Sequence, residues 1–285
     1  MSVIEKLLKG SIDMHFHAGP DPRVERRVDA LQAALQCQEV GMRAIVLKSH
    51  EYPTAPLAYI VNQVAKNILV FGSITLDLEV GGLNTHAVEA SAKLGARVVW
   101  MPTFTSANEL AKKHITGEGI TILDARGCLL PVVKEILEII RSYRMILATG
   151  HLSKSEVFTL VAEARKMNID KIIVTHPLAE DVGPSLNLDE QDRMAKEGAF
   201  IEHTMVMTTP LMGRMDPKMF AEAIHMVGAQ RCILSTDFGQ AFNPPSAEGM
   251  RIMIATMLKC GVTENEIEMM IKINPARLLG LDYPV

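Results

Sequence analysis

Histidine and aspartate residues at the ends of short apolar runs are the groups in this sequence that could do chemistry. Six of the nine histidines end such a run or lie within two residues of its end: His15, His17, His50, His151, His176 and His203. Asp237 occupies the same place in a further run. Titratable side chains are costly to bury, and six at equivalent positions are hard to explain as structural histidines. The pattern therefore predicts a functional site.

The spacing of these residues suggests a metal site. His15 and His17 are two apart, so on a strand both side chains project to one side, and Lys48 and His50 share a side in the same way. Two imidazoles with further ligands from neighbouring strands can enclose a divalent ion such as Zn²⁺. Asp237 could ligate the ion and accept a proton from bound water, and an open coordination position would make the site catalytic.

The elements that must position these residues alternate regularly along the chain. Eight apolar, often β-branched runs indicate strands at residues 11–17, 44–50, 68–75, 96–102, 145–151, 171–176, 199–204 and 231–237. Stretches with helical spacing follow them at 29–41, 54–67, 85–94, 131–142, 154–168, 188–198, 217–227 and 245–261. Continuous apolar strands are typical of a parallel sheet covered by helices. Eight such units predict an α/β fold, a (β/α)₈ TIM barrel forming one domain over residues 1–285, in preference to a doubly wound open sheet.

The connection between Thr103 and Pro131 is anomalously long. Residues 117–124 and 127–130 predict a small β-hairpin inserted after strand 4. A long insertion at this face is either a lid or substrate wall, or a surface excursion without a role.

Composition excludes several classes of protein. The chain has 285 residues, 48% of them hydrophobic, with 29 basic and 33 acidic residues and a formal net charge of −4. This balance provides no excess of positive charge for binding nucleic acid or an anionic membrane. No apolar run approaches the ~18 residues of a membrane span, and residues 1–9 lack the features of a signal peptide. Four widely separated cysteines indicate reduced thiols. We therefore expect a cytoplasmic protein with a small-molecule substrate, and homo-oligomers are common among such barrels.

The ordered set of ligands resembles the amidohydrolase superfamily of metal-dependent hydrolases. His-x-His on strand 1, one histidine each on strands 5 and 6, and aspartate on strand 8 carry the resemblance, together with the Asn-Pro-Ala-x-x-Leu-Gly-Leu segment at 274–281. The resemblance implies that His15, His17 and His151 bind a divalent metal. It makes His176 a ligand of a second metal or a partner of the activated water, and Asp237 both ligand and general base.

Strand 4 departs from the two-metal pattern of that superfamily. Residues 99–103 carry no acid or lysine where a bridging carboxylated lysine or glutamate is usual. The site therefore holds one ion, or the bridge comes from elsewhere, with Lys48 as the substitute; the alternative role of Lys48 is to hold a substrate carboxylate. Arg23, in the turn after strand 1, either grips an anionic substrate or pairs with Asp21. His50 and His203 are candidate substrate contacts, with extra metal ligands and proton carriers as the alternative roles.

These observations predict a zinc-dependent hydrolase, with manganese or iron as alternatives and one or two ions per chain. Metal-activated water would attack an amide, cyclic amide or ester-like bond of a small molecule. The second hypothesis is a metal-dependent decarboxylase of the same superfamily, because such enzymes also lack the strand 4 bridge. A barrel that binds ligand without catalysis is a third, disfavoured by the intact set of histidines and Asp237. Asp77, at the end of the third run, is expected to cap a loop, and residues 25–27 are expected to be a solvated charge run.

Overall fold

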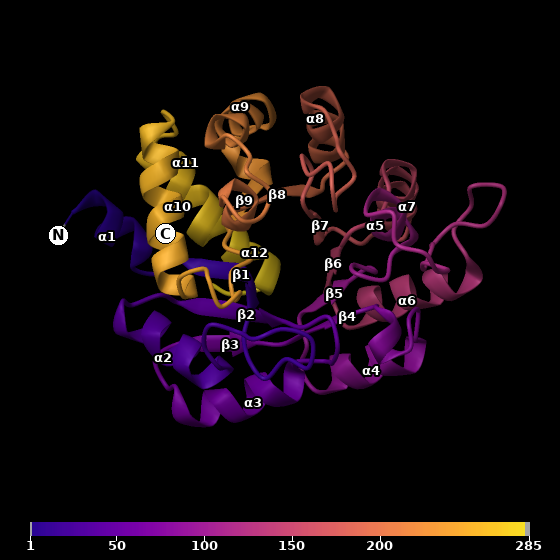
Figure 1. Cartoon of the computed structure of the whole chain (residues 1–285), viewed down its shortest axis with the longest axis horizontal. Coiled ribbons are helices and arrows are strands. Elements are labelled where there is room, and N and C mark those ends of the chain that lie inside the picture. Colours follow the sequence, from indigo (N-terminus) through magenta and orange to yellow (C-terminus); the bar gives the residue numbers. More distant parts are fainter. Residues whose placement is uncertain (1, 283–285) are drawn as a thin grey trace. The chain divides into compact units, whose positions relative to one another are not determined.

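The computed structural model describes residues 2–282, which divide into two compact units. Within the described residues, the first unit comprises 2–49, 54–72 and 203–282, and the second comprises 50–53 and 73–202. Each unit combines parallel strands with covering helices, and the elements are labelled in Figure 1.

Three parallel strands form the sheet of the first unit. They are β1 (Ile12–His17), β2 (Ala44–Lys48) and β3 (Leu69–Phe71), with Ile12 opposite Ala44 and Ala44 opposite Leu69. Every residue of β1 and β2 is buried, which explains their continuous apolar sequences. The segment after β9 (Cys232–Ser235) runs beside β1, where the Asp237 N–H donates to the His15 carbonyl over 2.7 Å and the His17 N–H donates to the Phe238 carbonyl over 2.8 Å.

The helices of the first unit are α1 (Val3–Leu8), α2 (Ala30–Glu39), α3 (Ala55–Val64), α9 (Pro217–Val227), α10 (Ser246–Lys259), α11 (Glu264–Glu268) and α12 (Asn274–Leu279). Short turns of other helix types lie at Met205–Thr208, Ala229–Arg231 and Met269–Ile273. Helices α2 and α3 pack against each other and cover β2 and β3 (Figure 1). Asp29 and Gln32 begin α2 with a capping box, which satisfies N–H groups that the helix itself leaves free.

The second unit contains five parallel strands in sequence order. They are β4 (Ser73–Thr75), β5 (Val98–Trp100), β6 (Ile146–Ala148), β7 (Ile172–Val174) and β8 (Phe200–Thr204), whose first residues pair with β7. Its helices are α4 (Thr85–Lys93), α5 (Ala107–Lys112), α6 (Pro131–Ser142), α7 (Lys154–Lys166) and α8 (Leu188–Lys196), with a 3₁₀ turn at Leu78–Val80. Among residues 2–282, no helix is long and apolar enough to cross a membrane.

Each predicted strand and helix has a counterpart in the structure, but the long insertion differs. The antiparallel pairing in 117–130 is a single bridge between Leu123 and Leu129, closed by Asp124, and Ile120 pairs with Ser106 instead. The sequence analysis also missed α5 within this connection. Both differences arise because a short segment held by a few side-chain contacts has no hydrophobic periodicity to reveal it.

The third predicted strand is interrupted at Gly72, where the chain passes very close to the start of α3. A Cβ atom on residue 72 would lie 2.3 Å from the Cα of Ala55 and 2.8 Å from the carbonyl carbon of Thr54. The Thr54 hydroxyl in turn donates to the Leu47 carbonyl over 2.7 Å, which holds this helix start against β2. Only glycine therefore fits at residue 72 without moving the backbone.

We expect Gly72→Ala to lower the free energy of unfolding by about 3 kcal/mol, because the added methyl group overlaps main-chain atoms that cannot rotate away. Urea denaturation monitored by circular dichroism measures the loss. Gly95→Ala is the control, since Gly95 has a φ of +91° but no atom within 4 Å of its Cβ position, and it should cost only about 1 kcal/mol. Equal losses in the two variants would contradict the close approach.

Candidate active site

A buried carboxylate, Asp13, joins β1 to the segment after β9 in the first unit. Its Oδ1 accepts hydrogen bonds from the N–H groups of His15 (3.3 Å) and Thr236 (3.0 Å). Its Oδ2 accepts from the hydroxyls of Thr236 (2.5 Å) and Ser246 (2.6 Å). Burial raises the pKa of Asp13, and these hydrogen bonds offset part of that rise. Asp13 thereby fixes the backbone next to two candidate ligands, His15 and Asp237.

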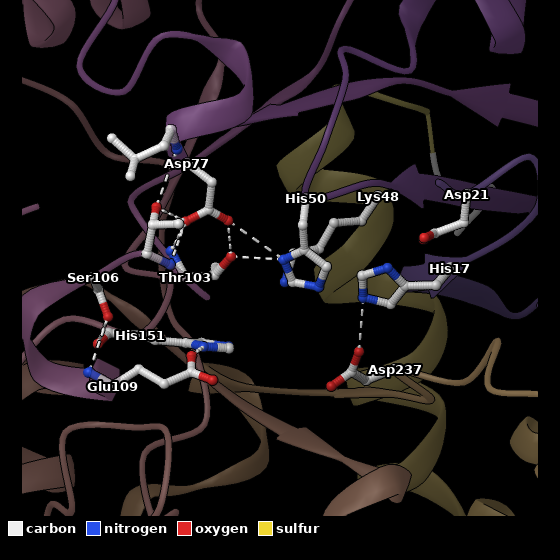
Figure 2. Close-up of polar contacts among 12 residues, drawn as sticks. His17, Asp21, Lys48, His50, Asp77, Thr103, Ser106, Glu109, His151 and Asp237 are labelled. Atoms are coloured by element: carbon white, nitrogen blue, oxygen red, sulfur yellow. Dashed lines mark hydrogen bonds and ion pairs between the residues drawn. The ribbon is translucent and has the colours of Figure 1, made fainter. Parts of the chain in front are cut away.

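Two imidazoles of β1 converge on Asp237. The Nε2 atoms of His15 and His17 lie 3.0 and 3.1 Å from the Asp237 Oδ1, and all three residues are buried. Figure 2 shows the contact between His17 and Asp237. Atoms that ligate one tetrahedral ion are roughly 3.3 Å apart, because bonds to zinc are about 2.0–2.1 Å long. The donor set and its spacing therefore fit a divalent metal with little adjustment.

The backbone at Asp237 adopts an uncommon conformation. Its φ is +52°, in the left-handed region that aspartate tolerates better than most residues. Two residues later, a Cβ at Gly239 would lie 2.1 Å from the His17 carbonyl oxygen, so the chain must be glycine there. Strained backbone of this kind is concentrated at functional sites.

Lys48 at the end of β2 lies within the same cluster. Its side chain is buried, and its Nζ is 3.0 Å from the His15 Nε2. Lysine can only donate and a carboxylate can only accept, so the His15 Nε2, which is also 3.0 Å from the Asp237 Oδ1, accepts from Lys48 only in the tautomer that carries its proton on Nδ1. A metal ion would need the same lone pair, and its binding would therefore require the Lys48 ammonium to turn to another partner.

The turn after β1 is organised by Arg26 and not by Arg23. Asp21 pairs with the Arg26 guanidinium at 2.6 Å, and only 6% of the Arg26 side chain is exposed. Burial by itself would raise the pKa of Asp21. The pKa is nevertheless lowered, because Asp21 accepts hydrogen bonds from the N–H groups of Val24 and Arg23 and lies beside the charge of Arg26. The Arg26 Nη2 is 3.5 Å from the Nδ1 of His17. The expectation of a solvated charge run is therefore wrong for Arg26, while Arg23 lies on an exposed turn.

His203, also in the first unit, is buried against a helix. Its ring stacks on Phe220 of α9, with centroids 5.0 Å apart and planes 29° apart. Its role as a substrate contact stays a prediction.

In the second unit, His50 and Asp77 are connected through Thr103. The His50 Nδ1 is 2.6 Å from the Thr103 hydroxyl, which donates its own proton to the Asp77 carboxylate (Figure 2). A threonine hydroxyl has one proton, so the proton between His50 and Thr103 belongs to the His50 Nδ1. In the neutral ring, the Nε2 of His50 then carries the lone pair. Phe104 stacks on this ring at a centroid distance of 3.7 Å and limits its rotation.

Asp77 holds the loop after β5 with several further hydrogen bonds. It accepts from the N–H groups of Thr103 (2.8 Å) and Thr105 (3.0 Å) and from the Thr105 hydroxyl (2.7 Å). Burial favours the neutral acid, but the contact with His50 and these donors hold the pKa of Asp77 well below its usual range. The expected loop-capping role of Asp77 is confirmed. Its connection to His50 through Thr103 adds a second role, which is to hold the proton of His50 on Nδ1.

His151, after β6, is oriented by Glu109 of α5. The His151 Nδ1 forms a short hydrogen bond with Glu109 Oε2, and the other carboxylate oxygen pairs with Lys113. Despite opposing burial, contacts with His151 and Lys113 lower the pKa of Glu109, so the carboxylate accepts the Nδ1 proton. The His151 Nε2 is then the nitrogen with a lone pair, as in metal-binding histidines whose other nitrogen donates to a carboxylate.

The sequence analysis missed Glu109, although one signal pointed to a helix start there. Ser106 and Glu109 form a Ser-x-x-Glu pattern, and the Ser106 hydroxyl accepts the Glu109 N–H at 3.1 Å (Figure 2). The same hydroxyl donates to the His151 carbonyl at 3.0 Å. Nothing in the pattern indicates that the glutamate side chain turns to a histidine 42 residues away.

His176, after β7, lies beside His151 in the second unit. The two ring centroids are 5.3 Å apart. His176 has a φ of +48°, and a Cβ at Gly183 would lie 2.0 Å from its carbonyl oxygen. The predicted residues thus gather within each unit: His15, His17, Lys48 and Asp237 in the first, and His50, His151 and His176 in the second.

Solved structures with the same fold belong to the amidohydrolase superfamily. An amidohydrolase from Pseudomonas aeruginosa matches over 98% of both chains, with a TM-score of 0.65 and 15% identity. A protein named as a probable 2-pyrone-4,6-dicarboxylic acid hydrolase from Acinetobacter baumannii matches 95% of this chain and 100% of its own, with a TM-score of 0.63 and 13% identity. A 2,6-dihydroxybenzoate decarboxylase from Rhizobium matches 95% of this chain and 99% of its own, with a TM-score of 0.55 and 13% identity. The fold is therefore the predicted α/β barrel of the TIM type.

Within this fold class, the chain belongs to a family of unknown function, DUF6282, whose sequence profile matches residues 10–202. No curated protein matches the sequence significantly.

We expect Asp77→Asn to lower the free energy of unfolding by about 3 kcal/mol at pH 7, because several buried donors lose a charged acceptor. A carboxyl group whose folded pKa lies below the unfolded value of about 3.9 stabilises fully above that value, and the stabilisation is lost as pH falls towards the folded pKa. The gap between wild type and variant should therefore shrink between about pH 5 and pH 3.

Urea titrations at several pH values measure this gap. Asp124→Asn, which alters a partly exposed carboxylate that caps a loop, should cost much less than Asp77→Asn. A gap for Asp77→Asn that does not change with pH would show that Asp77 is not ionised in the folded protein.

Proposed function

We propose that this chain is a metal-dependent hydrolase that cleaves an ester, cyclic ester or amide bond of a small carboxylate-bearing molecule. The observation that carries the proposal is the convergence of His15 Nε2 and His17 Nε2 on Asp237 Oδ1, within 3.1 Å and buried. Zinc prefers a donor set of imidazoles and a carboxylate, which supports a metal centre over an ion pair with a structural role alone.

His15, His17 and Asp237 would hold the ion, and the superfamily resemblance assigns His151 and His176 as the remaining ligands. Zinc is the metal proposed, with manganese or iron as alternatives and one or two ions per chain. A bound divalent ion supplies a water whose pKa falls to about 7 and polarises the carbonyl under attack. The Nδ1–H of His151, held by Glu109, supports its assignment, because it leaves Nε2 as the donor.

The residues of the chain would move the protons and hold the substrate. Asp237 accepts a proton from the attacking water and returns it to the leaving group. Lys48, once displaced from His15, offers a buried ammonium to a substrate carboxylate. His50, with its Nδ1 proton fixed by the Thr103–Asp77 pair, presents Nε2 as a hydrogen-bond acceptor or proton carrier.

A decarboxylase is the second candidate. The end of β5 carries Met101, Pro102 and Thr103, with no acid or lysine to bridge two ions, and Lys48 suits a carboxylate substrate. Among the similar folds are a hydrolase named for a pyrone dicarboxylic acid and a decarboxylase named for a dihydroxybenzoate. Both names describe small carboxylic acids, which supports the substrate class without choosing the reaction.

Metal content should be measured first, by elemental analysis of protein purified without chelators or a metal-binding tag. We expect about one ion per chain, and loss of most of it in His15→Ala/His17→Ala, because two of the ligands are removed. About two ions would indicate a bridged site and make Lys48 carboxylation the next test. His86→Ala/His225→Ala, which removes two exposed histidines, should keep the full content. Full retention in the first variant, or no metal after reconstitution with zinc or manganese, would refute the proposed centre.

The reaction is tested on a panel of carboxylate-bearing lactones, esters, cyclic amides and hydroxybenzoates. Formation of the carboxylic acid together with the freed alcohol or amine, without carbon dioxide, supports the hydrolase, and carbon dioxide release supports the decarboxylase. On the substrate so found, Asp237→Asn should reduce kcat by about 100-fold or more with the fold intact, since the general base is lost. Asp189→Asn, an exposed aspartate on α8, should leave kcat unchanged. Activity near wild type in Asp237→Asn would exclude Asp237 as the base.

A further inference from the structure

Helix α5 carries a side chain that contacts the loops of two candidate ligands. The Asn108 amide nitrogen, Nδ2, donates to the His151 carbonyl over 3.0 Å and lies 3.3 and 3.4 Å from the carbonyl oxygens of Val182 and Gly183. His151 follows β6, whereas Val182 and Gly183 belong to the loop after β7 that contains His176. A side-chain amide has two protons to donate, so this one group can link both loops.

Gly183 connects this contact to His176. A Cβ at Gly183 would lie 2.0 Å from the His176 carbonyl oxygen and 3.1 Å from the His176 Cβ, so the two residues are in direct contact. Lys112, four residues after Asn108 and therefore on the same face of α5, donates to the Gly183 carbonyl over 2.6 Å. The position of His176 therefore depends on where α5 holds Gly183.

Further hydrogen bonds join the same loop to α5. The Lys112 Nζ also donates to the Ser185 hydroxyl over 2.8 Å, and that hydroxyl donates to the Ala179 carbonyl over 3.0 Å. The Ala179 N–H in turn donates to the His176 carbonyl over 3.1 Å. A continuous series of hydrogen bonds thus runs from α5 to the backbone of His176.

The long insertion holds the start of α5 in place. The Ala107 N–H donates to the Ile120 carbonyl over 2.8 Å, and a Cβ at Gly119 would lie 2.4 Å from the Ala107 Cα. Glu156 of α7 accepts a hydrogen bond from the Ile122 N–H over 3.0 Å, which fixes the insertion itself. The side chain next to Ala107 therefore extends from a helix start that is held by its surroundings.

The place of Asn108 within α5 does not account for an asparagine there. Ser106 is the N-cap of this helix, and its hydroxyl already accepts the Glu109 N–H. Inside a helix, asparagine is a poorer helix former than alanine, so alanine at residue 108 would favour α5 if the side chain contacted nothing else. The contacts with the two loops are the interactions that offset this preference.

We propose, on the basis of the function proposed above, that Asn108 is a positioning residue that holds His151 and His176 where their rings bind metal. Asn108 donates only to main-chain carbonyls, so it fixes both loops without competing for a ring nitrogen. Groups that orient ligands without touching the metal raise its affinity, because ligands that are already in place need not be ordered on binding. Asn108 acts through the main chain, whereas Glu109 orients the ring of His151.

Hydrogen exchange followed by mass spectrometry tests the link in the full chain, treated with a chelator so that no metal contributes. In Asn108→Ala we expect the amides of residues 150–152 and 176–186 to exchange about tenfold faster, because loss of the hydrogen bonds permits local opening. Asn84→Ala is the matched control, since Asn84 is a half-buried asparagine of the same unit whose amide donates to the Val80 carbonyl over 3.2 Å. It should accelerate exchange near α4 and leave both histidine loops unchanged.

Zinc affinity, measured by competition with a chromophoric chelator, tests the consequence for the ligands. We expect Asn108→Ala to weaken zinc binding by about tenfold or more, and Asn84→Ala to remain within about twofold of wild type. Asn108→Asp keeps the shape of the side chain but removes its N–H donors, so it should weaken zinc binding at least as much as Asn108→Ala. Affinity near wild type in Asn108→Asp would overturn the role of the amide.

The two measurements separate a failure of this proposal from a failure of the proposed function. A wild-type chain that binds no zinc refutes the function, and the exchange measurement then decides whether Asn108 holds the two loops. Unchanged exchange in residues 150–152 and 176–186, or equal acceleration across the whole second unit, would overturn the positioning role. Equal zinc affinity in Asn108→Ala and Asn84→Ala would overturn it as well.

Discussion

The buried carboxylate of Asp13 is the constraint on which the candidate ligands of the first unit depend. An ionised carboxylate in the protein interior is costly unless hydrogen bonds replace its water, and Asp13 receives four of them. Their donors belong to β1, to the segment after β9 and to the first residue of α10. The His15 N–H is one of these donors, and Asp237 directly follows the donor Thr236. The backbone positions of His15 and Asp237 therefore follow from hydrogen bonds to Asp13 in which their own side chains take no part.

The second unit repeats this arrangement with acids that face histidines. Asp77 acts on His50 through Thr103, and Glu109 acts on His151 directly. In both cases the acid fixes the proton on Nδ1 and so determines which ring nitrogen is available for chemistry. The histidines alone would leave two tautomers open. In the second unit, the ring nitrogen that is available for chemistry is therefore decided by Asp77 and Glu109.

Most of the fold and many of the candidate residues could be predicted because both follow from local periodicity. Continuous apolar runs mark strands buried on both faces, and a histidine at the end of such a run falls at the end of the strand. The roles of Glu109 and Arg26 could not be predicted in the same way. Their contacts with His151 and Asp21 depend on the conformations of loops, which leave no periodic pattern in the sequence. The break at Gly72 and the single bridge in the insertion likewise depend on contacts that leave no periodic trace.

The left-handed backbone at Asp237 restricts how this position can evolve. Glycine, asparagine, aspartate and histidine adopt a φ of +52° more readily than other residues, whereas glutamate, the other common carboxylate ligand, does so less readily. Replacement of Asp237 by glutamate would therefore meet a backbone penalty in addition to any change in side-chain reach. Diversification is more accessible through the surrounding lysine, arginine and loop residues than through a longer carboxylate at this position.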